Sequence, residues 1–306
     1  MASKFYIMNE KMDRWGLNSP AEGVLTDPKG FGIEYKGEYV RVGDRWIVDR
    51  VELQQPQPEG KVIFAVNPYN TYQSFINFLN AAKALYLVYQ PAGMKTEYFA
   101  DIDVVKIDKV GYSAGKRMEV PCKFICKSLF YTEEVFEYHI QKADREIRWD
   151  FRWYTRFNDQ NYVYFDFNND GHVDSPFSLS FTGYCTNPEM SVYQDGKIIG
   201  YVKFNLTLQQ NETLVFSTYD DDLKIQVDGK DRMDILDFTN ENFFKIPQGN
   251  VEIYFRSQAG RMNNINMTLE KYYKGCLLYT SSGRMGRDWR LDSAQLGNQR
   301  GITESE

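Results

Sequence analysis

Histidine and cysteine are scarce in this 306-residue sequence, which has two of the first and four of the second. Nucleophilic catalysis by Ser or Cys needs a base held beside the nucleophile. His139 lies in a charged stretch and His172 in a polar turn, and neither position favours an oriented base. The sequence therefore predicts no Ser–His or Cys–His catalytic site and no cofactor.

Cys122 and Cys126 lie in "EVPCKFICKSLFY", which has the pattern of a β-strand. Four residues along a strand span about 13 Å, whereas disulfide-bonded Cα atoms lie within about 7 Å of each other. The same spacing puts both thiols on one face of the strand. We expect both cysteines to be small core residues, with a metal-binding pair as the alternative.

A recognisable carboxylate pair for acid–base catalysis is also missing. Asp220, Asp221 and Asp222 are adjacent in "TYDDDLK", but neighbouring strand residues point to opposite faces, so we expect a solvated turn. "GYSAGKRM" lacks the first glycine and the Ser or Thr after Lys116 that a phosphate loop requires. No enzyme class is therefore predicted.

Long apolar runs and basic blocks are absent as well. No run of about 18 uncharged apolar residues occurs, so the sequence predicts no membrane-spanning helix. "MASKFYIMNEKMDRW" lacks the apolar core of a signal peptide, and we expect folding in the cytoplasm. The net charge is −6 and no long basic block is present, so nucleic acid is not an expected binding partner.

Aromatic residues, by contrast, are abundant, with 22 Tyr and 21 Phe. Both residue types favour strands and are useful at interfaces. The first 145 residues show mainly strand patterns, such as the alternating "EYVRVGDRWIVDRVELQ" with a turn at Gly43-Asp44. The N-terminal part of the chain is therefore expected to be mainly β.

One stretch of this part, "NPYNTYQSFINFLNAAKA", predicts an α-helix near residues 69–83. Its apolar residues recur at i, i+3, i+4 and i+7, which places them on one helix face; they are Tyr72, Phe75, Ile76 and Leu79. Asn70 can cap the helix, and Gln73 completes a capping-box-like pair.

The pattern changes around residues 132–150, which are charged, then aromatic, and alternate poorly, so we place a domain boundary after residue 145. Strands beyond it are short, with turns at "NNDG", "QDGK" and "VDGK", and Asp-Gly between apolar runs is a strong hairpin signal. Residues 146–275 are expected to form an all-β sandwich. Residues 276–306, rich in Gly, Ser, Arg and Gln, are expected to be flexible or to order on a partner.

The stretch "YFDFNNDGHVDSPFSLSF" has the spacing of oxygen ligands that opens a calcium loop; the candidate ligands are Asp166, Asn168, Asp170 and Asp174. A complete EF-hand loop has a bidentate Glu at its twelfth position, where this sequence has Phe177, and the flanks alternate like strands. We therefore expect no metal site but a polar turn in which Asn, Asp and Gly171 adopt left-handed conformations. The calcium loop remains the weaker alternative.

Several stretches together resemble the distal tail proteins of phages. "NNDGHVDSPFSLSFTGYCTNPEM" resembles the entry to that family's C-terminal domain, and "NENFFKIPQGNVEIYF" its late strand after a Pro-x-Gly-Asn turn. "VNPYNTYQSFINFLNAAKALYLVYQP" is similar to the family's helix and following strand, and "DIDVVKIDKVGYSAGKRMEVPCKFICKSLFY" to the paired strands after it. The resemblance covers roughly residues 45–273 and depends on the order and spacing of these motifs.

The resemblance implies an architecture: a tail-tube-like β-barrel or sandwich with one packed α-helix over residues 1–145, and a galectin-like β-sandwich over residues 146–275. It further implies a structural distal tail or baseplate protein of the virion, assembled in the host cytoplasm. Its copies would form a ring, usually a homohexamer, between the tail tube protein and the hub or tail-associated protein. Receptor-binding proteins would attach to the ring, and DNA would only pass through it.

For such a ring we expect aromatic side chains of the N-terminal domain as interface anchors; the candidates are Tyr35, Tyr39, Trp46, Tyr69, Tyr86 and Tyr89. Ordinary core positions are the alternative for each of them. We further hypothesise that a moderately acidic surface lines the channel of the ring, so that DNA passes through it without sticking.

Two other classes of function, a carbohydrate-binding module and an enzyme, are alternatives for this sequence. Galectin-like sandwiches can bind carbohydrate, usually by stacking an aromatic ring, often Trp, on the sugar. Residues 160–275 contain no Trp and one His, so the galectin sugar motif is absent. A tail-borne hydrolase is the third possibility, and it would need the carboxylate pair that the sequence does not reveal.

Overall fold

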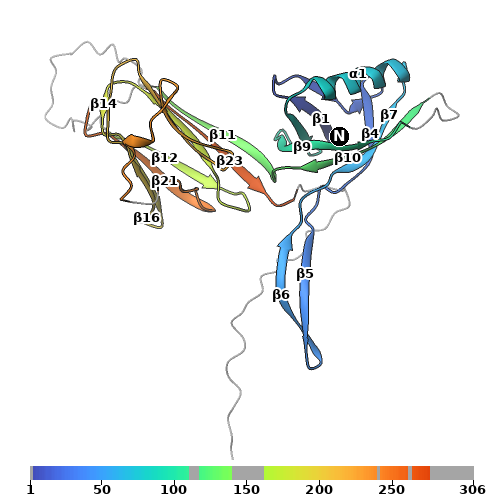
Figure 1. Cartoon of the computed structure of the whole chain (residues 1–306), viewed down its shortest axis with the longest axis horizontal. Helices are drawn as coiled ribbons and strands as arrows, with labels where there is room; N and C mark the ends of the chain where they lie inside the picture. Colours follow the sequence, from blue (N-terminus) through green and yellow to red (C-terminus); the bar gives the residue numbers. More distant parts are fainter. Residues whose placement is uncertain (1–2, 110–116, 140–161, 240–241, 261–263, 276–306) are drawn as a thin grey trace, which may run out of the picture.

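The computed structural model describes residues 3–109, 117–139, 162–239, 242–260 and 264–275. The described residues are mostly β-strands, with one α-helix and one short 3-10 turn (Figure 1). They bury two hydrophobic cores, one in the N-terminal half and one in the C-terminal half. The predicted mainly-β fold with one packed helix is therefore confirmed. No helix within these residues is long and apolar enough to cross a membrane.

The N-terminal half is built from eleven strands and the helix, with the eleventh strand leading into the C-terminal half. The elements are β1 (Lys4–Asn9), β2 (Arg14–Gly16), β3 (Asn18–Ser19), β4 (Gly23–Lys29), β5 (Tyr35–Val42), β6 (Arg45–Leu53), β7 (Glu59–Phe64), α1 (Pro68–Ala81), β8 (Leu85–Gln90), β9 (Tyr98–Ile107), β10 (Met118–Cys126) and β11 (Phe130–His139). The antiparallel order β1-β8-β9-β10-β7-β4-β3 forms one curved sheet.

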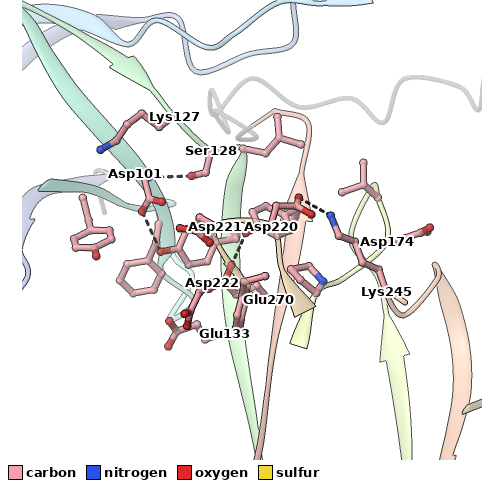
Figure 2. Close-up of a pocket in the computed structure, with 18 of the residues that line it drawn as sticks. Asp101, Lys127, Ser128, Glu133, Asp174, Asp220, Asp221, Asp222, Lys245 and Glu270 are labelled. Carbon is pink, nitrogen blue, oxygen red and sulfur yellow. Dashed lines mark hydrogen bonds and ion pairs between the residues drawn. The ribbon is translucent and has the colours of Figure 1, made fainter. Parts of the chain in front are cut away.

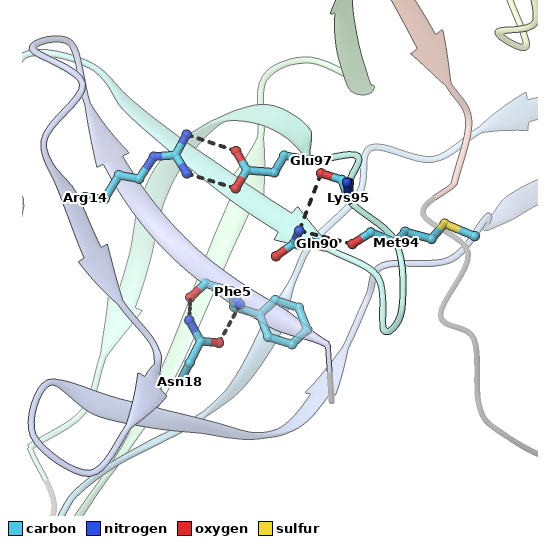
Figure 3. A network of polar contacts seen from close by, with 7 residues as sticks. All are labelled: Phe5, Arg14, Asn18, Gln90, Met94, Lys95 and Glu97. Atoms are coloured by element: carbon cyan, nitrogen blue, oxygen red, sulfur yellow. Dashed lines mark hydrogen bonds and ion pairs between the residues drawn. The ribbon is translucent and has the colours of Figure 1, made fainter. Parts of the chain in front are cut away.

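The two ends of this curved sheet meet at residues 14–19. β2 pairs with β1 and β3 pairs with β4. The Asn18 side chain fastens the two ends, because it accepts a hydrogen bond from the Phe5 N–H at 2.7 Å and donates one to the Phe5 carbonyl at 2.8 Å (Figure 3). Among the described strands the pairing order nevertheless stays open between β2 and β3, so the expected barrel is corrected to a curved sheet without continuous closure.

Helix α1 packs on the curved sheet with the predicted face. Phe75 and Leu79 are buried, and the Trp15 ring lies 5.5 Å from the Phe75 ring, centroid to centroid. The helix begins at Pro68, with Asn67 before it in a left-handed conformation (φ 43°). The predicted cap at Asn70 was wrong, because proline already fits the first helical turn, where its missing N–H costs nothing.

The C-terminal half is a sandwich of two antiparallel sheets. Its elements are β12 (Tyr162–Asn169), β13 (Phe177–Thr182), β14 (Cys185–Thr186), β15 (Glu189–Gln194), β16 (Lys197–Lys203), β17 (Thr207–Leu208), β18 (Thr213–Tyr219), β19 (Asp222–Val227), β20 (Lys230–Asp231), the 3-10 turn Met233–Ile235, β21 (Gly249–Arg256), β22 (Ala259–Gly260) and β23 (Asn264–Tyr273). One sheet has the order β20-β19-β18-β13-β23-β11 and the other β12-β21-β15-β16, and the second core fills the space between them.

Two predicted hairpin turns of the sandwich have the backbone that Asp-Gly favours. Asp195 and Gly196 have φ of 51° and 74°, and Asp228 and Gly229 have φ of 50° and 75°. Positive φ at both central residues is what a type I′ turn requires.

Strands β11 and β23 join the two halves. They pair along their whole length, from Phe130 with Tyr273 to His139 with Asn264, and β11 also pairs with β9 at Tyr131 and Phe99. Sheets of the two halves thus form one continuous sheet (Figure 1). The predicted boundary after residue 145 and the predicted tail at 276–306 lie outside the described residues.

Candidate functional site

The hairpin of β5 and β6, which we call the arm (residues 35–53), projects from the N-terminal half (Figure 1). It pairs with no other described strand, and every residue from Glu38 to Glu52 is exposed. The predicted turn at Gly43-Asp44 is present, with Gly43 at φ 63°. A two-stranded hairpin alone is marginally stable in water, so an arm of this length, about 30 Å, is suited to packing against something else.

One face of the arm is mainly apolar, with the charged Arg41 opposite Trp46 as an exception. The pairing register puts Tyr39 opposite Val48 and Trp46 opposite Arg41, and cross-strand partners share a face. We call this face the apolar stripe; its exposed apolar residues are Tyr35, Tyr39, Trp46, Val48 and Val51. Trp46 is 68% and Tyr39 is 55% exposed. Monomeric proteins rarely leave such a continuous patch uncovered, so the stripe has the character of a docking surface.

The opposite face of the arm is charged near its base. Lys36 pairs with Glu52 and Glu38 with Arg50 across the strands, while Val40 and Ile47 lie further toward the tip. Among these side chains Arg50 forms an ion pair with Glu52 on the same strand, and an exposed pair of this kind stabilises little. The two faces therefore differ, and this difference gives the arm a preferred side for contact.

The predicted interface residues separate into groups. Tyr35, Tyr39 and Trp46 all lie on the apolar stripe, which the alternating pattern with its Gly-Asp turn could indicate. Tyr69 is half exposed on α1, where the Lys109 ammonium lies 4.9 Å from its ring centre. Tyr86 on β8 is partly buried and lines a cleft described below.

Tyr89 is a core residue and not the interface residue that we expected, because its side chain is fully buried. Its ring packs 5.2 Å from Phe5 and 6.0 Å from Phe31, centroid to centroid. Strand β8 lies between β1 and β9 in the curved sheet, and Leu87, Val88 and Tyr89 are all buried there. The residue therefore belongs to the core and offers no surface to a neighbouring chain.

The candidate calcium ligands do not converge. Asp166 and Asn168 are exposed on β12, opposite Glu252 and Asn250, and Asp170 contacts Lys271 at 3.1 Å. Asp174 lines the cleft between the two halves instead. Within the part of the chain that the structure describes, no group of three His, Cys, Asp or Glu side chains could hold a metal ion.

The predicted left-handed turn at "NNDG" was wrong, since none of its four residues has a positive φ. The turn is held by Asn169 instead. Its side chain accepts a hydrogen bond from the Gly171 N–H at 3.0 Å and donates to the carbonyls of Val173 and Ile246 at 3.1 Å each. The hydrogen bonds of this buried amide hold the turn, although none of its residues adopts the left-handed conformation that we expected.

A cleft of about 840 Å³ lies where the two halves meet, and carboxylates from both halves line it (Figure 2). The carboxylate-bearing residues that line it are Glu10, Asp101, Glu133, Asp174, Asp220, Asp221, Asp222 and Glu270. Lys245 pairs with Asp220 at 2.6 Å, and Lys127 lines the N-terminal side. Sequence reasoning missed this cluster, because β9, β11, β23 and the turn from β18 to β19 come together only in the folded structure.

Burial in this cleft shifts proton affinities. It raises the pKa of Glu270 to about 7, with Glu133, Asp101 and Asp221 adding like charge and the Tyr272 hydroxyl bond opposing the shift. Burial also raises the pKa of Asp101, which the charge of Lys127 opposes. The carboxyl group of Glu270 can therefore stay protonated near neutral pH.

The cysteines that the structure describes are inert. Cys122 and Cys126 are buried and free, as predicted, and burial raises the pKa of each thiol to about 12. A thiol with so high a pKa is a poor nucleophile and metal ligand. His172 accepts a hydrogen bond at Nδ1 from the Lys274 N–H, at 3.2 Å, and the side chain of His139 lies outside the described residues.

Comparisons with known proteins point to one family. Residues 4–127 match the family model described as distal tail protein, N-terminal domain, and residues 170–272 match that of the siphovirus-type tail component, C-terminal domain. A search of curated proteins finds no significant match.

Solved structures with the same fold come from phage tails. Two structures of the phage P2 baseplate in its activated conformation, with Ca and with Sr, each have a chain that is 14% identical, with a TM-score of 0.60. The alignment covers 90% of this chain and 100% of that chain in both cases. The crystal structure of SPP1 Dit, a hub adsorption apparatus protein of phages that infect Gram-positive bacteria, is 11% identical with a TM-score of 0.56, covering 87% and 98% of the two chains.

Proposed function

Because this chain belongs to the phage distal tail protein family, we propose that it is a structural protein whose copies form a homohexameric ring in the virion tail. The ring joins the tail tube protein to the hub or tail-associated protein and anchors receptor-binding proteins. Its work is shape and contact rather than bond-making chemistry, and DNA only passes through its opening. The host cytoplasm is the place of assembly.

The apolar stripe of the arm is the observation that carries this proposal. Its three aromatic residues, Tyr35, Tyr39 and Trp46, are each more than half exposed, and burying the part of them that is still exposed removes about 250–450 Å² from water. A surface of this kind is stabilised when the arm lies across the neighbouring copy. A contact between two different patches repeats from copy to copy and closes into a ring when the rotation fits.

The two halves have separate roles in this proposal. The N-terminal residues, 1–145, build the ring through the curved sheet, α1 and the arm. The C-terminal sandwich, residues 146–275, points outward and offers its surface to receptor-binding proteins. Residues 276–306 are proposed to extend toward a neighbouring subunit.

The test is the particle mass of purified protein with one change in the arm. Trp46→Asp and Tyr39→Asp each put a charge into the apolar stripe and are expected to convert hexamers into monomers, because a buried unpaired carboxylate strongly disfavours the contact. Mass photometry and negative-stain images measure the mass and the ring. Leu223→Asp is the matched control, since Leu223 is 51% exposed on β19 in the C-terminal sandwich, and its rings should persist.

A wild-type protein that stays monomeric at every concentration would contradict the proposal. Rings that form equally well in both arm variants would show that the arm is not the contact.

A further inference from the structure

The outer face of the β12-β21-β15-β16 sheet carries three clustered tyrosines. One side of this sheet covers the core, and the other is open to solvent. Tyr164, 55% exposed, lies opposite Tyr254 in the pairing register, with the two rings stacked at 5.8 Å and 24°. Tyr193 packs its edge against Tyr254 at 5.3 Å. We call these three side chains the tyrosine platform.

Hydrogen-bond acceptors adjoin the tyrosine platform on the same face. Asp166 lies opposite Glu252 and Asn168 opposite Asn250, one and two rows along from Tyr164 and Tyr254. With Tyr193 and Asp195 they line an open groove of about 450 Å³. The Tyr254 hydroxyl donates to Glu252 Oε2 at 2.8 Å, which fixes that carboxylate beside the rings.

We propose that this face binds a neutral saccharide. A pyranose ring has an apolar face of C–H groups, which stacks on an aromatic ring such as Tyr164, and an edge of hydroxyl donors. Carboxylates accept hydrogen bonds only, and amides both accept and donate, so the groove's Asp, Glu and Asn side chains match a ligand rich in hydroxyl groups. This activity goes beyond ring formation and does not depend on it.

The charges of the groove disfavour other classes of ligand. Among the described residues that line it, none is Lys or Arg, and three carry a carboxylate, namely Asp166, Asp195 and Glu252. An anionic polymer would meet like charges without compensation. A protein partner is disfavoured too, because the centres of protein interfaces are depleted in Asp and Glu.

In the proposed site a tyrosine ring stacks on the sugar, where galectin-like sandwiches often use tryptophan. The absence of Trp from residues 160–275 removes the usual galectin stacking residue, but the pairing of β12 with β21 and of β21 with β15 brings three Tyr rings together. Because the groove is shallow and open, affinity for one oligosaccharide should be weak, with a Kd on the order of 0.1–1 mM.

The experiment is a titration of the full chain with neutral oligosaccharides, namely the tetramers of N-acetylglucosamine and glucose together with lactose, followed by calorimetry and a glycan array. Wild type is expected to bind at least one of them, and Tyr164→Ala to lower that affinity at least tenfold. Tyr164→Phe, which keeps the ring, should bind within about twofold of wild type. Tyr184→Ala is the matched control, because Tyr184 is 47% exposed outside this face.

Absence of binding on the array and at 10 mM of each oligosaccharide (a value about tenfold above the expected Kd) would overturn the proposal. Equal binding by Tyr164→Ala would overturn the assigned site. A Tyr164→Ala protein that loses its rings while wild type binds no saccharide would identify the face as a protein contact instead. Particle mass and saccharide titration are separate measurements, so the ring and the saccharide site can fail independently.

Discussion

Glu270 is a largely buried carboxyl group in the cleft where the two halves meet. It lies on β23 directly opposite Glu133 on β11, and like charges in facing positions repel. Burial raises its pKa from 4.5 to about 7, while the Tyr272 hydroxyl bond opposes the shift. The folded protein therefore binds a proton at Glu270 more tightly than the unfolded chain does.

This difference predicts the direction of a pH effect on stability. A raised pKa in the folded state gives stability that is complete below about pH 4.5 and is lost as pH rises through about 7. Glu270→Gln keeps an oxygen for Tyr272 and cannot ionise, so it should stabilise the protein by about 1–3 kcal/mol at pH 8 and by little at pH 4.

Denaturant unfolding at both pH values measures this effect. Glu137→Gln, at an exposed position of β11, serves as the control and should show no such difference. Identical gains for Glu270→Gln at pH 4 and pH 8 would exclude the electrostatic explanation.

Gly171 illustrates a glycine that is required by space and not by backbone conformation. A Cβ at this position would lie 2.9 Å from the Tyr272 carbonyl oxygen and 3.1 Å from the Tyr272 nitrogen. Gly171→Ala must push against the backbone of β23, and we expect a loss of about 1–3 kcal/mol in the free energy of unfolding.

Gly32→Ala is the matched control for Gly171. A Cβ at Gly32 would meet nothing within 4 Å, and Gly32 has no positive φ. Its stability should stay within about 0.5 kcal/mol of wild type in chemical unfolding. A similar loss in both variants would show that crowding at Tyr272 is not the cause.

The arm is nearly independent of the fold that carries it. Its strands pair only with each other among the described strands, and its base is closed by the Gln54 N–H, which donates to the Glu34 carbonyl at 2.8 Å. The buried core of the N-terminal half takes no residue from β5 or β6. Folding of the single chain should therefore not need the arm.

Replacing residues 36–52 by a two-residue Asn-Gly turn tests this independence, since Asn-Gly closes a tight hairpin between Tyr35 and Leu53. We expect thermal unfolding within about 3 °C of wild type, because little surface is buried in the arm, together with complete loss of rings. Circular dichroism and mass photometry measure the two properties on one sample. A large fall in Tm would mean that the arm packs on its own chain.

The elements show where sequence patterns succeed. Period-two alternation and a Gly-Asp turn predict the arm, and the i, i+3, i+4, i+7 stripe predicts α1, because both signals are local. Asp195-Gly196 and Asp228-Gly229 turn as predicted for the same reason. "NNDG" does not, since its conformation is set by the contact of Asn169 with Ile246, 77 positions away.

The sequence is less informative about how the strands assemble, because pairing between distant strands decides the order of the sheets. The charged stretch of residues 132–150 predicts a domain boundary after residue 145, which lies outside the described residues, and the described part of this stretch is the end of β11, in register with β23 through residue 139. The tyrosine platform was not predicted for the same reason, as its three residues lie on three strands. Of the candidate site, the three aromatic residues of the arm could be predicted from the sequence, and the cleft where the two halves meet could not.

Ring and saccharide site together predict avidity. If the proposed hexamer presents one saccharide site per copy, Trp46→Asp should bind a glycan-coated surface about 10²-fold more weakly than wild type. Its calorimetric affinity for a soluble oligosaccharide should be unchanged, since the tyrosine platform is intact. Surface plasmon resonance provides the first value, and parallel losses in both assays would show that the substitution disturbs the sandwich itself.

The long pairing of β11 with β23 has a mechanical consequence. Each strand has 10 residues, and they run antiparallel between the sandwich and the curved sheet. Tension applied to the sandwich along these strands loads all their hydrogen bonds together, as shear, whereas a sideways pull would break them one after another. If the sandwich anchors receptor-binding proteins, as we propose, the protein would therefore resist tension best along the direction in which these two strands point.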